Sequence, residues 1–154
     1  ADVSATADCA DRGLQYIAEH GRLRAVQHIE QAERMVENHP ALPANSYLAI
    51  ADTVQRLQSR NIRIIFFTPP YYRAYTETYR ANASDSIAGM RHQMRNLQRE
   101  YGVEYYDFST DVEFINDHQL FTDSDHLNRC GARLFSAKLK RAMADGAALI
   151  SQER

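Results

Sequence analysis

Two short runs of the sequence have the residue pattern of β-strands, and a helical repeat lies between them. Ile62 to Phe67 reads IRIIFF and ends abruptly at Pro69-Pro70, whereas Val103 to Phe108 reads VEYYDF. Runs of β-branched and aromatic residues without alternation are typical of strands covered on both faces. Between them, apolar residues recur at helical spacing from Ser84 to Tyr101. A strand, a helix and a second strand in this order predict an α/β fold with two parallel strands joined by a right-handed crossover.

The segments before the first strand have helical periodicity. Apolar residues recur at helical spacing from Leu14 to Val36, and Gly21 is expected to divide this stretch into two helices. A connection with two prolines follows, and Asn45 or Ser46 is expected to begin the next helix.

The segments after each strand are expected to be loops. The tyrosine-rich sequence YYRAYTETYR, residues 71–80, predicts a polar loop, and a second long loop runs from Ser109 to Leu127. Asn128 is expected to cap the last helix, which carries Phe135 and Leu139 on its buried face.

The length of 154 residues predicts one domain. We expect residues 1–11 to be a loose lead-in, residues 12–145 to form a single α/β domain, and residues 146–154 to be a tail. Because sheets commonly have about four to six strands, and because the sequence opens at Ala1 without a methionine, we expect further strands to belong to a longer protein. Any apolar sheet surface left uncovered favours self-association.

The composition of the chain bears on which partners it could bind and on whether it spans a membrane. Hydrophobic residues make up 44% and charged residues 25% of the chain, and the net charge is −2. These values are typical of a soluble globular protein and favour neither nucleic acid nor an anionic membrane surface as a partner. The longest apolar run, near Ile64 to Phe67, is too short to span a bilayer. Cys9 and Cys130 lack metal-ligand spacing and are expected to be two unrelated thiols, with one long-range disulfide as the alternative.

Asp123 and His126 stand where the second long loop meets the last helix. In open α/β sheets, ligands bind beyond the carboxyl ends of the strands, so both loops lie on the candidate site face. A carboxylate three residues before a histidine can accept a hydrogen bond from Nδ1–H and leave Nε2 to act as a general base. This is the base and the orienting acid of a nucleophilic triad, and Asp125 is expected to point away toward solvent or the helix N-terminus.

Two other interpretations of this junction remain open. Aspartate and asparagine near a helix N-terminus also stabilise it by capping, with the histidine an ordinary surface residue. A metal site built from Asp123, Asp125, His126 and His118 has less support, because no second histidine stands at ligand spacing. No metal is therefore expected.

The segment FTDSDHLNRCGARLFSAKL, residues 121–139, resembles the last block of the SGNH (GDSL-like) hydrolase superfamily. In that block a D-x-x-H pair supplies the catalytic aspartate and histidine, and Asp123 and His126 match it, with Leu127, Gly131 and Ala132 matching the surround. IRIIFFTPPYY is similar to a later central strand of the superfamily that ends in a T-P-P-like turn, and VEYYDFS is similar to the strand after it. The resemblance is closest to the DltD-like and alginate-acetylation-like cell-envelope subgroup.

The resemblance implies part of a flavodoxin-like SGNH fold, with parallel strands and flanking helices, that lacks the N-terminal strands and the nucleophile block. It implies the C-terminal part of a serine esterase or O-acyltransferase that acts on acyl esters of glycans or cell-envelope polymers. Asp123 and His126 would belong to a Ser-His-Asp triad, and Thr68, Tyr71 and Tyr72 would bind substrate. No cofactor is implied, and a bacterial periplasmic or extracytoplasmic location is favoured.

The sequence also departs from the superfamily pattern. It contains neither a G-D-S-like nucleophile block nor the G-x-N-D asparagine, and Ser109, which follows a strand, lacks the tight glycine turn that exposes a nucleophile. We therefore expect the isolated chain to be inactive. The alternative is a non-catalytic α/β binding or assembly module that retains a relic D-x-x-H.

Overall fold

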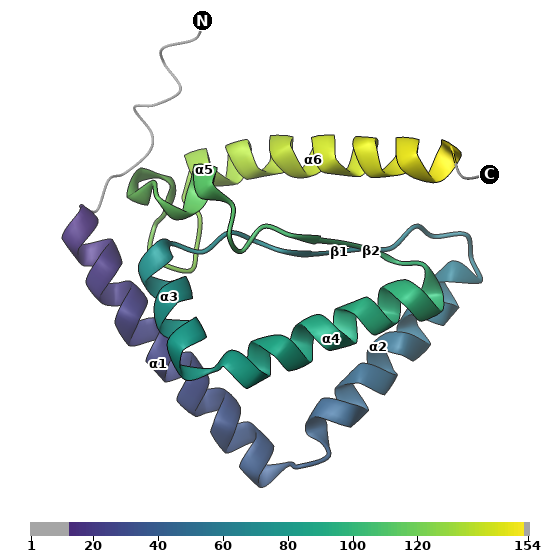
Figure 1. Ribbon diagram of the computed structural model, residues 1–154, viewed down its shortest axis with the longest axis horizontal. Helices are drawn as coiled ribbons and strands as arrows, with labels where there is room; N and C mark the ends of the chain where they lie inside the picture. The colour runs from purple at the N-terminus through teal and green to yellow at the C-terminus, as the bar shows by residue number, and fades with distance from the viewer. Residues whose placement is uncertain (1–12, 153–154) are drawn as a thin grey trace, which may run out of the picture.

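The structure is a computed structural model that describes residues 13–152, apart from the side chains at positions 42, 86, 87 and 146–152. Helices and strands alternate in its central part (Figure 1). In chain order the elements are α1 (Leu14–Asn38), α2 (Leu42–Gln58), β1 (Ile65–Thr68), α3 (Arg73–Asn82), α4 (Ser84–Tyr101), β2 (Glu104–Asp107), α5 (Val112–Ile115), the 3₁₀ helix η2 (His118–Leu120) and α6 (Arg129–Gln152).

The two strands are parallel neighbours, as the sequence predicted. Their register runs from Ile65 opposite Glu104 to Thr68 opposite Asp107, and α3 and α4 form the connection between them. Helix α6 lies on one side of the strand pair and α4 on the other, with α2 beyond α4 (Figure 1). The expected α/β class is therefore confirmed for the described residues.

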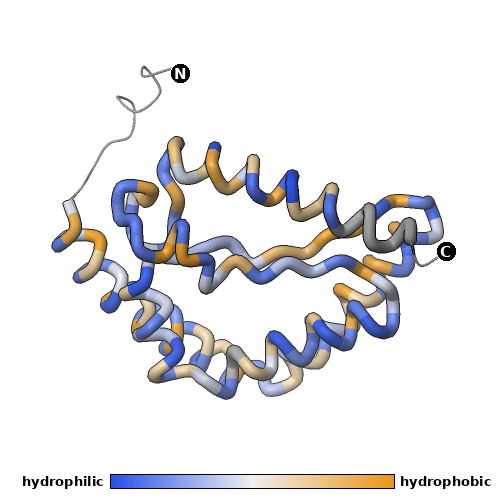
Figure 2. The backbone as a smooth tube through the Cα atoms, turned by 45° about the horizontal axis from the view of Figure 1, so that its top comes forward, coloured by the Kyte–Doolittle hydropathy of each residue, from blue (hydrophilic) through white to orange (hydrophobic). Residues whose placement is uncertain are grey.

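The alternation of side chains along β1 divides the core into two clusters. Phe67 contacts Phe135 of α6, with ring centroids 5.6 Å apart, whereas Phe66 packs on the opposite side with Leu97 of α4. The α6-side cluster comprises Ile17, Tyr72, Phe108, Phe114, Leu120, Phe121 and Phe135. The cluster between α2 and α4 comprises Ala51, Val54, Leu97 and Val103. Hydrophobic and hydrophilic residues intermix along every helix in Figure 2, and within residues 13–152 no helix is long and apolar enough to cross a bilayer.

Gly21 does not divide the first helix. Helix α1 is continuous from Leu14 to Asn38, and Gly21 is buried inside it. A Cβ at this position would lie 3.0 Å from both the backbone nitrogen of Tyr75 and the Cβ of Ser124. The glycine therefore allows α1 to approach α3 and the loop before α6, and its physical role is close packing rather than helix termination.

Several expected boundaries were wrong. Strand β1 begins at Ile65 rather than Ile62, and the expected loop from Ser109 to Leu127 contains the short helices α5 and η2. Helix α2 begins at Leu42, three residues before Asn45, because Pro43 fits the first turn of a helix. The predicted tyrosine-rich loop is mostly helical, since α3 spans Arg73–Asn82. Helix α6 continues to Gln152, through most of the predicted tail. The predicted lead-in, residues 1–11, lies outside the described residues.

The cap of α6 is the one expected from the sequence. The Asn128 side-chain oxygen accepts hydrogen bonds from the backbone N–H groups of Cys130 and Gly131, at 2.9 and 3.0 Å. Its side-chain amide also donates to the carbonyl of Gln119 at 2.6 Å. One buried side chain thus starts the helix and holds the preceding loop against it.

The cysteine expectation was wrong for the residue that the structure describes. Cys130 is disulfide-bonded, not a free thiol, and Cys9 lies outside the described residues. Apolar surface is also accessible on and beside the sheet, because Phe67 of β1 is 46% exposed and Ile62, three residues before β1, is 45% exposed. Self-association through this surface stays a prediction.

Gly131 and Gly89 offer a matched pair of helix substitutions. A Cβ at Gly131 would collide with the carbonyl oxygen of Leu120, whereas a Cβ at Gly89 would meet no atom within 4 Å. We expect Gly131→Ala to lower the unfolding temperature, since overpacking costs about 1–3 kcal/mol. Gly89→Ala should raise it, because alanine in a helix is favoured over glycine by about 0.5–1 kcal/mol. Thermal unfolding followed by circular dichroism measures both, and equal effects of the two variants would contradict the packing described here.

Candidate functional site

The candidate site is a closed turn that ends at α6. Phe121 and Leu127 form an antiparallel bridge, and the Thr122 N–H donates to the carbonyl of His126 at 2.9 Å. The Asn128 N–H donates to the carbonyl of Leu120, also at 2.9 Å. Residues 122–126 are therefore held by hydrogen bonds at their base, and the side chains of the turn have defined positions.

Asp123 and His126 face each other within this turn. The Nδ1 atom of His126 lies 3.0 Å from Oδ1 and 3.1 Å from Oδ2 of Asp123, compared with 3.7 Å from the nearest carboxylate oxygen of Asp125. The expectation that Nδ1 faces Asp123 rather than Asp125 is confirmed. An ionised carboxylate can only accept hydrogen bonds, so the proton of a neutral imidazole sits on Nδ1 and the Nε2 lone pair stays available. The His126 side chain is 65% exposed, which leaves Nε2 accessible to a reacting group.

The Asp123 carboxylate is stabilised by its neighbours. The backbone N–H groups of Asp125 and His126 donate to its Oδ1 at 3.1 and 2.8 Å. Partial burial would raise the pKa of Asp123, but these hydrogen bonds and the imidazole together hold the pKa below its usual value. Asp123 is therefore ionised at neutral pH and can stabilise a protonated His126.

Asp125 does not point to solvent, so that expectation was wrong. Its side chain is only 6% exposed and lies 3.8 Å from Arg24 and 4.0 Å from the Nε2 atom of His28, both on α1. A buried carboxylate requires cationic or hydrogen-bonding partners, and α1 supplies them. Asp125 thus joins the turn to the N-terminal helix.

Ser124, between the two aspartates, reinforces the same contact. Its side chain is fully buried, its carbonyl accepts from the Tyr72 N–H at 2.8 Å, and its Oγ lies 3.3 Å from the Nδ1 atom of His20. A serine with no exposed surface cannot serve as a nucleophile, so Ser124 has a structural role. Within the described residues, no serine hydroxyl forms a hydrogen bond with His126.

Sequence reasoning missed the contribution of α1 to this site. His20, Arg24 and His28 follow one another at intervals of four residues, which places them on one face of a helix. Three side chains that can carry positive charge on one helix face could have predicted a carboxylate packed against that face.

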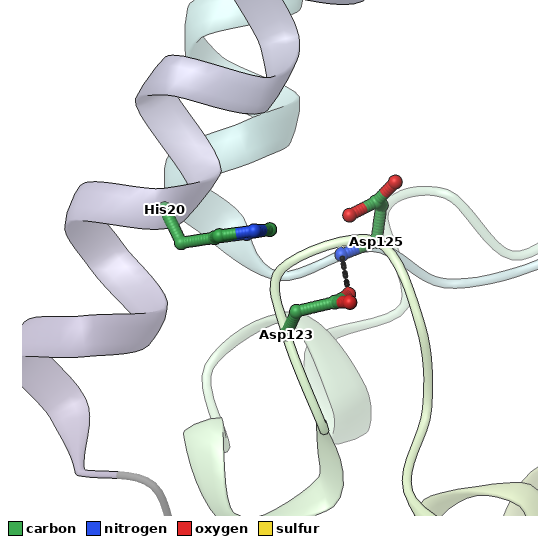
Figure 3. A group of neighbouring side chains, drawn as sticks. All are labelled: His20, Asp123 and Asp125. Atoms are coloured by element: carbon green, nitrogen blue, oxygen red, sulfur yellow. Dashed lines mark hydrogen bonds between the residues drawn. The ribbon is translucent and has the colours of Figure 1, made fainter.

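His20, Asp123 and Asp125 also form a possible cation-binding group. Their ligand atoms all lie within 4.8 Å of one another, and Figure 3 shows the imidazole of His20 directed from α1 toward the turn. This set differs from the one considered from the sequence, which used His118 and His126. The Asp123 carboxylate already accepts hydrogen bonds from Asp125 and His126, so we assign no metal chemistry to this group.

A pocket of about 330 Å³ opens at the carboxyl ends of the strands. Thr68 and Tyr71 line it, as expected of substrate-binding residues, but Tyr72 does not. Tyr72 is 4% exposed and packs edge-on against Phe121 in the core. The complete lining comprises His28, Thr68, Tyr71, Tyr75, Thr76, Tyr79, Arg80, Met90, Arg91, Asp107 and Ser109.

His126 is not part of the pocket lining, but the two sites are adjacent. His28 lines the pocket and lies 4.0 Å from Asp125, whose neighbour in the chain is His126. Asp125 and His28 therefore link the pocket lining to the turn that carries the Asp123–His126 pair.

No protein-family model, curated protein or solved structure matches the chain.

The tautomer of His126 tests the hydrogen bond to Asp123. At a pH where the ring is neutral, we expect the proton on Nδ1 in the wild-type chain, because only that tautomer donates to the carboxylate. In Asp123→Ala this preference should disappear. Nitrogen-15 chemical shifts of the imidazole report the tautomer, and a wild-type ring protonated on Nε2 would contradict the assignment.

The lowered pKa of Asp123 predicts a pH-dependent contribution to stability. Above the ordinary aspartate pKa of about 3.9 the ionised carboxylate stabilises the fold, and this contribution is lost as the pH falls through the lower folded-state value. We therefore expect Asp123→Asn to unfold at a lower temperature than wild type at neutral pH, with the difference shrinking in acid. Asp52→Asn, which removes an exposed carboxylate on α2, controls for net charge. A difference independent of pH would contradict the lowered pKa.

Proposed function

We propose that this chain is the C-terminal part of an SGNH-type serine esterase or O-acyltransferase that acts on acyl esters of glycans or cell-envelope polymers. The observation that carries the proposal is the Asp123–His126 pair, in which the carboxylate contacts Nδ1 at 3.0 Å and the ring is 65% exposed. A parallel strand pair with a pocket at its carboxyl ends gives the pair the setting expected of an α/β enzyme.

In the proposed reaction, Nε2 of His126 takes the proton of a serine hydroxyl as the serine oxygen attacks the ester carbonyl. The resulting imidazolium, stabilised by Asp123, then protonates the departing alkoxide of the glycan. Water or a sugar hydroxyl next attacks the acyl-serine; His126 accepts its proton and returns it to the departing serine oxygen, which restores the serine hydroxyl and the neutral imidazole. The nucleophilic serine and the oxyanion donors are proposed to come from a segment outside residues 13–152.

The disulfide at Cys130 supports the proposed location. Structural disulfides persist in oxidising compartments such as the bacterial periplasm and are rare in the cytosol. We therefore place the proposed reaction outside the cytoplasm, where cell-envelope polymers are found.

A non-catalytic binding or assembly module is the second candidate. It is favoured by the two backbone N–H groups that donate to Asp123, because such bonds also stabilise a turn that has no catalytic role. In that case replacing Asp123 would lower the stability of the fold, and replacing His126 would leave ester turnover unchanged.

Ester turnover separates the two candidates. We expect the 154-residue chain to hydrolyse p-nitrophenyl acetate no faster than a surface imidazole. In the protein that also contains the nucleophile segment, His126→Ala should lower acyl transfer by about 10⁴-fold or more, as loss of a triad base does. Asp123→Ala should lower it by a smaller factor.

His92→Ala is the matched control, since His92 is exposed on α4 and contacts only Asn96, at 3.2 Å, among the described side chains. Its turnover should equal that of wild type. Full activity in His126→Ala would overturn the proposal and favour the binding module. An acyl-enzyme burst from the 154-residue chain alone would show that the nucleophile lies within it.

A further inference from the structure

One wall of the pocket is a row of tyrosines on and just before α3. Tyr71, Tyr75 and Tyr79 recur every four residues, and neighbouring ring centroids lie 5.1 and 5.8 Å apart. Burial, together with the neighbouring tyrosines and Asp125, raises the pKa of Tyr75, so its hydroxyl is neutral at physiological pH. Tyr75 is only 8% exposed, so the accessible ring surface of the row belongs mainly to the half-buried Tyr71 and Tyr79.

The opposite parts of the lining are polar and carry both hydrogen-bond donors and acceptors. Arg91 and Asp107 form an ion pair at 3.3 Å, and Ser109 follows β2 at the same edge. Thr68 shares a hydrogen bond of 2.7 Å with the hydroxyl of Tyr105. A donor beside an acceptor matches a pair of vicinal hydroxyl groups, each of which can donate and accept.

Thr76 provides an independent sign of a ligand. Its residue is 9% exposed and lines the pocket, and its Oγ1 is buried without a hydrogen-bond partner among the described residues. An unsatisfied buried hydroxyl destabilises the folded state. Threonine in a helix populates two χ1 rotamers, and the inference requires the one that turns Oγ1 toward the pocket. A hydroxyl-bearing ligand would supply the missing partner.

From these three observations we propose that the pocket binds a sugar ring, whose apolar face stacks on the Tyr71–Tyr75–Tyr79 row and one of whose hydroxyl groups pairs with Thr76. The volume of about 330 Å³ is at the small end of ligand pockets, which span about 300–1,000 Å³. One ring with its substituents fills such a space.

Other ligand classes fit the lining less well. A long acyl chain requires aliphatic walls, and Met90 is the one aliphatic side chain among the lining residues described. A phosphate group would find Arg91 of the lining already paired with the Asp107 carboxylate, at 3.3 Å. A nucleoside shares the ability to stack on tyrosine, and the experiment below distinguishes it.

The link between this pocket and ester chemistry rests on the proposed function. The Tyr75 hydroxyl hydrogen-bonds to Nδ1 of His28 at 2.9 Å, and Nε2 of His28 lies 4.0 Å from Asp125, which adjoins His126. A sugar ring on the tyrosine row is thus the glycan part of the ester whose acyl group would lie toward His126. Binding of the sugar itself requires no catalysis and is measured separately.

Thr76→Val is the decisive variant because valine keeps the shape of threonine and removes the hydroxyl. We expect this variant to unfold at a higher temperature than wild type, since the unsatisfied group is gone, and yet to bind sugar more weakly. Thr78→Val is the matched control on the same helix. Thr78 donates to the Ala74 carbonyl at 2.8 Å and does not line the pocket, so its loss should give no gain in stability and no change in binding.

The probes are the methyl glycosides of glucose, mannose and N-acetylglucosamine, with cyclohexanol and adenosine as comparison ligands. We expect at least one glycoside to shift the ring signals of Tyr71, Tyr75 and Tyr79 saturably in NMR titrations at millimolar concentration. Thr76→Val should weaken that binding about three- to tenfold, as loss of one neutral hydrogen bond does.

Three results would overturn the inference: no response of the tyrosine rings to any glycoside, a response only to adenosine or cyclohexanol, or equal binding by Thr76→Val. A lower unfolding temperature in Thr76→Val would show that the Thr76 hydroxyl already has a hydrogen-bond partner. Thr76 would then no longer be evidence for a ligand. If sugars fail to bind while His126→Ala still abolishes ester turnover, the pocket assignment is wrong and the proposed function stands. If sugars bind but ester turnover does not depend on His126, the pocket assignment stands and the proposed function is wrong.

Discussion

The contact of α1 at Gly21 is the constraint on which the arrangement of the site depends. Without a side chain at this position, α1 reaches the backbone of Tyr75 and the side chain of Ser124 at once. The helix is thereby pressed against α3, which carries the tyrosine row, and against the turn that carries Asp123 and His126. A larger residue at position 21 would crowd both elements, because two of the three nearest atoms would lie 3.0 Å from its Cβ, closer than ordinary van der Waals contact.

The packing of α1 against the turn also provides electrostatic partners for Asp125. Its carboxylate is removed from water, and a buried charge persists only where opposite charge or hydrogen-bond donors compensate it. Arg24 on α1 provides that opposite charge at 3.8 Å, and the Ser124 hydroxyl donates to the Asp125 carboxylate at 3.4 Å, while Asp123 remains partly exposed and contacts His126. Two carboxylates separated by one residue thus perform different tasks, since one anchors the turn and the other orients the imidazole.

Local signals in the sequence predicted the parts of this architecture that local physics determines. The strands at Ile65–Thr68 and Glu104–Asp107, the helix between them, the Asn128 cap and the Asp123–His126 hydrogen bond all involve neighbours in sequence or a strong hydrophobic pattern. The errors arose where distant segments meet. Gly21 looked like a helix break because its packing partners lie more than fifty residues away, and Asp125 looked exposed because its cationic partner, Arg24, lies on α1.

The helical state of the tyrosine segment was a different kind of error. Its four-residue spacing was visible, but its polar character and the prolines before it favoured a loop. Burial of one face of α3 against α1 outweighs that local preference, since Tyr75 and Thr76 are buried there.

The parallel pairing of β1 and β2 has a consequence for the order in which the chain acquires its structure. Phe66 pairs in register with Tyr105, so the two strands can meet only after the chain between them has turned back on itself. Bringing the ends of such a long segment together lowers the entropy of the chain before any contact between the strands forms. Helices α3 and α4 form from local contacts and reduce the distance between the two strands. The pocket and the turn at Asp123 both depend on that late pairing and on α1. They are therefore expected to be among the last parts of the chain to become native and the first to loosen when it is destabilised.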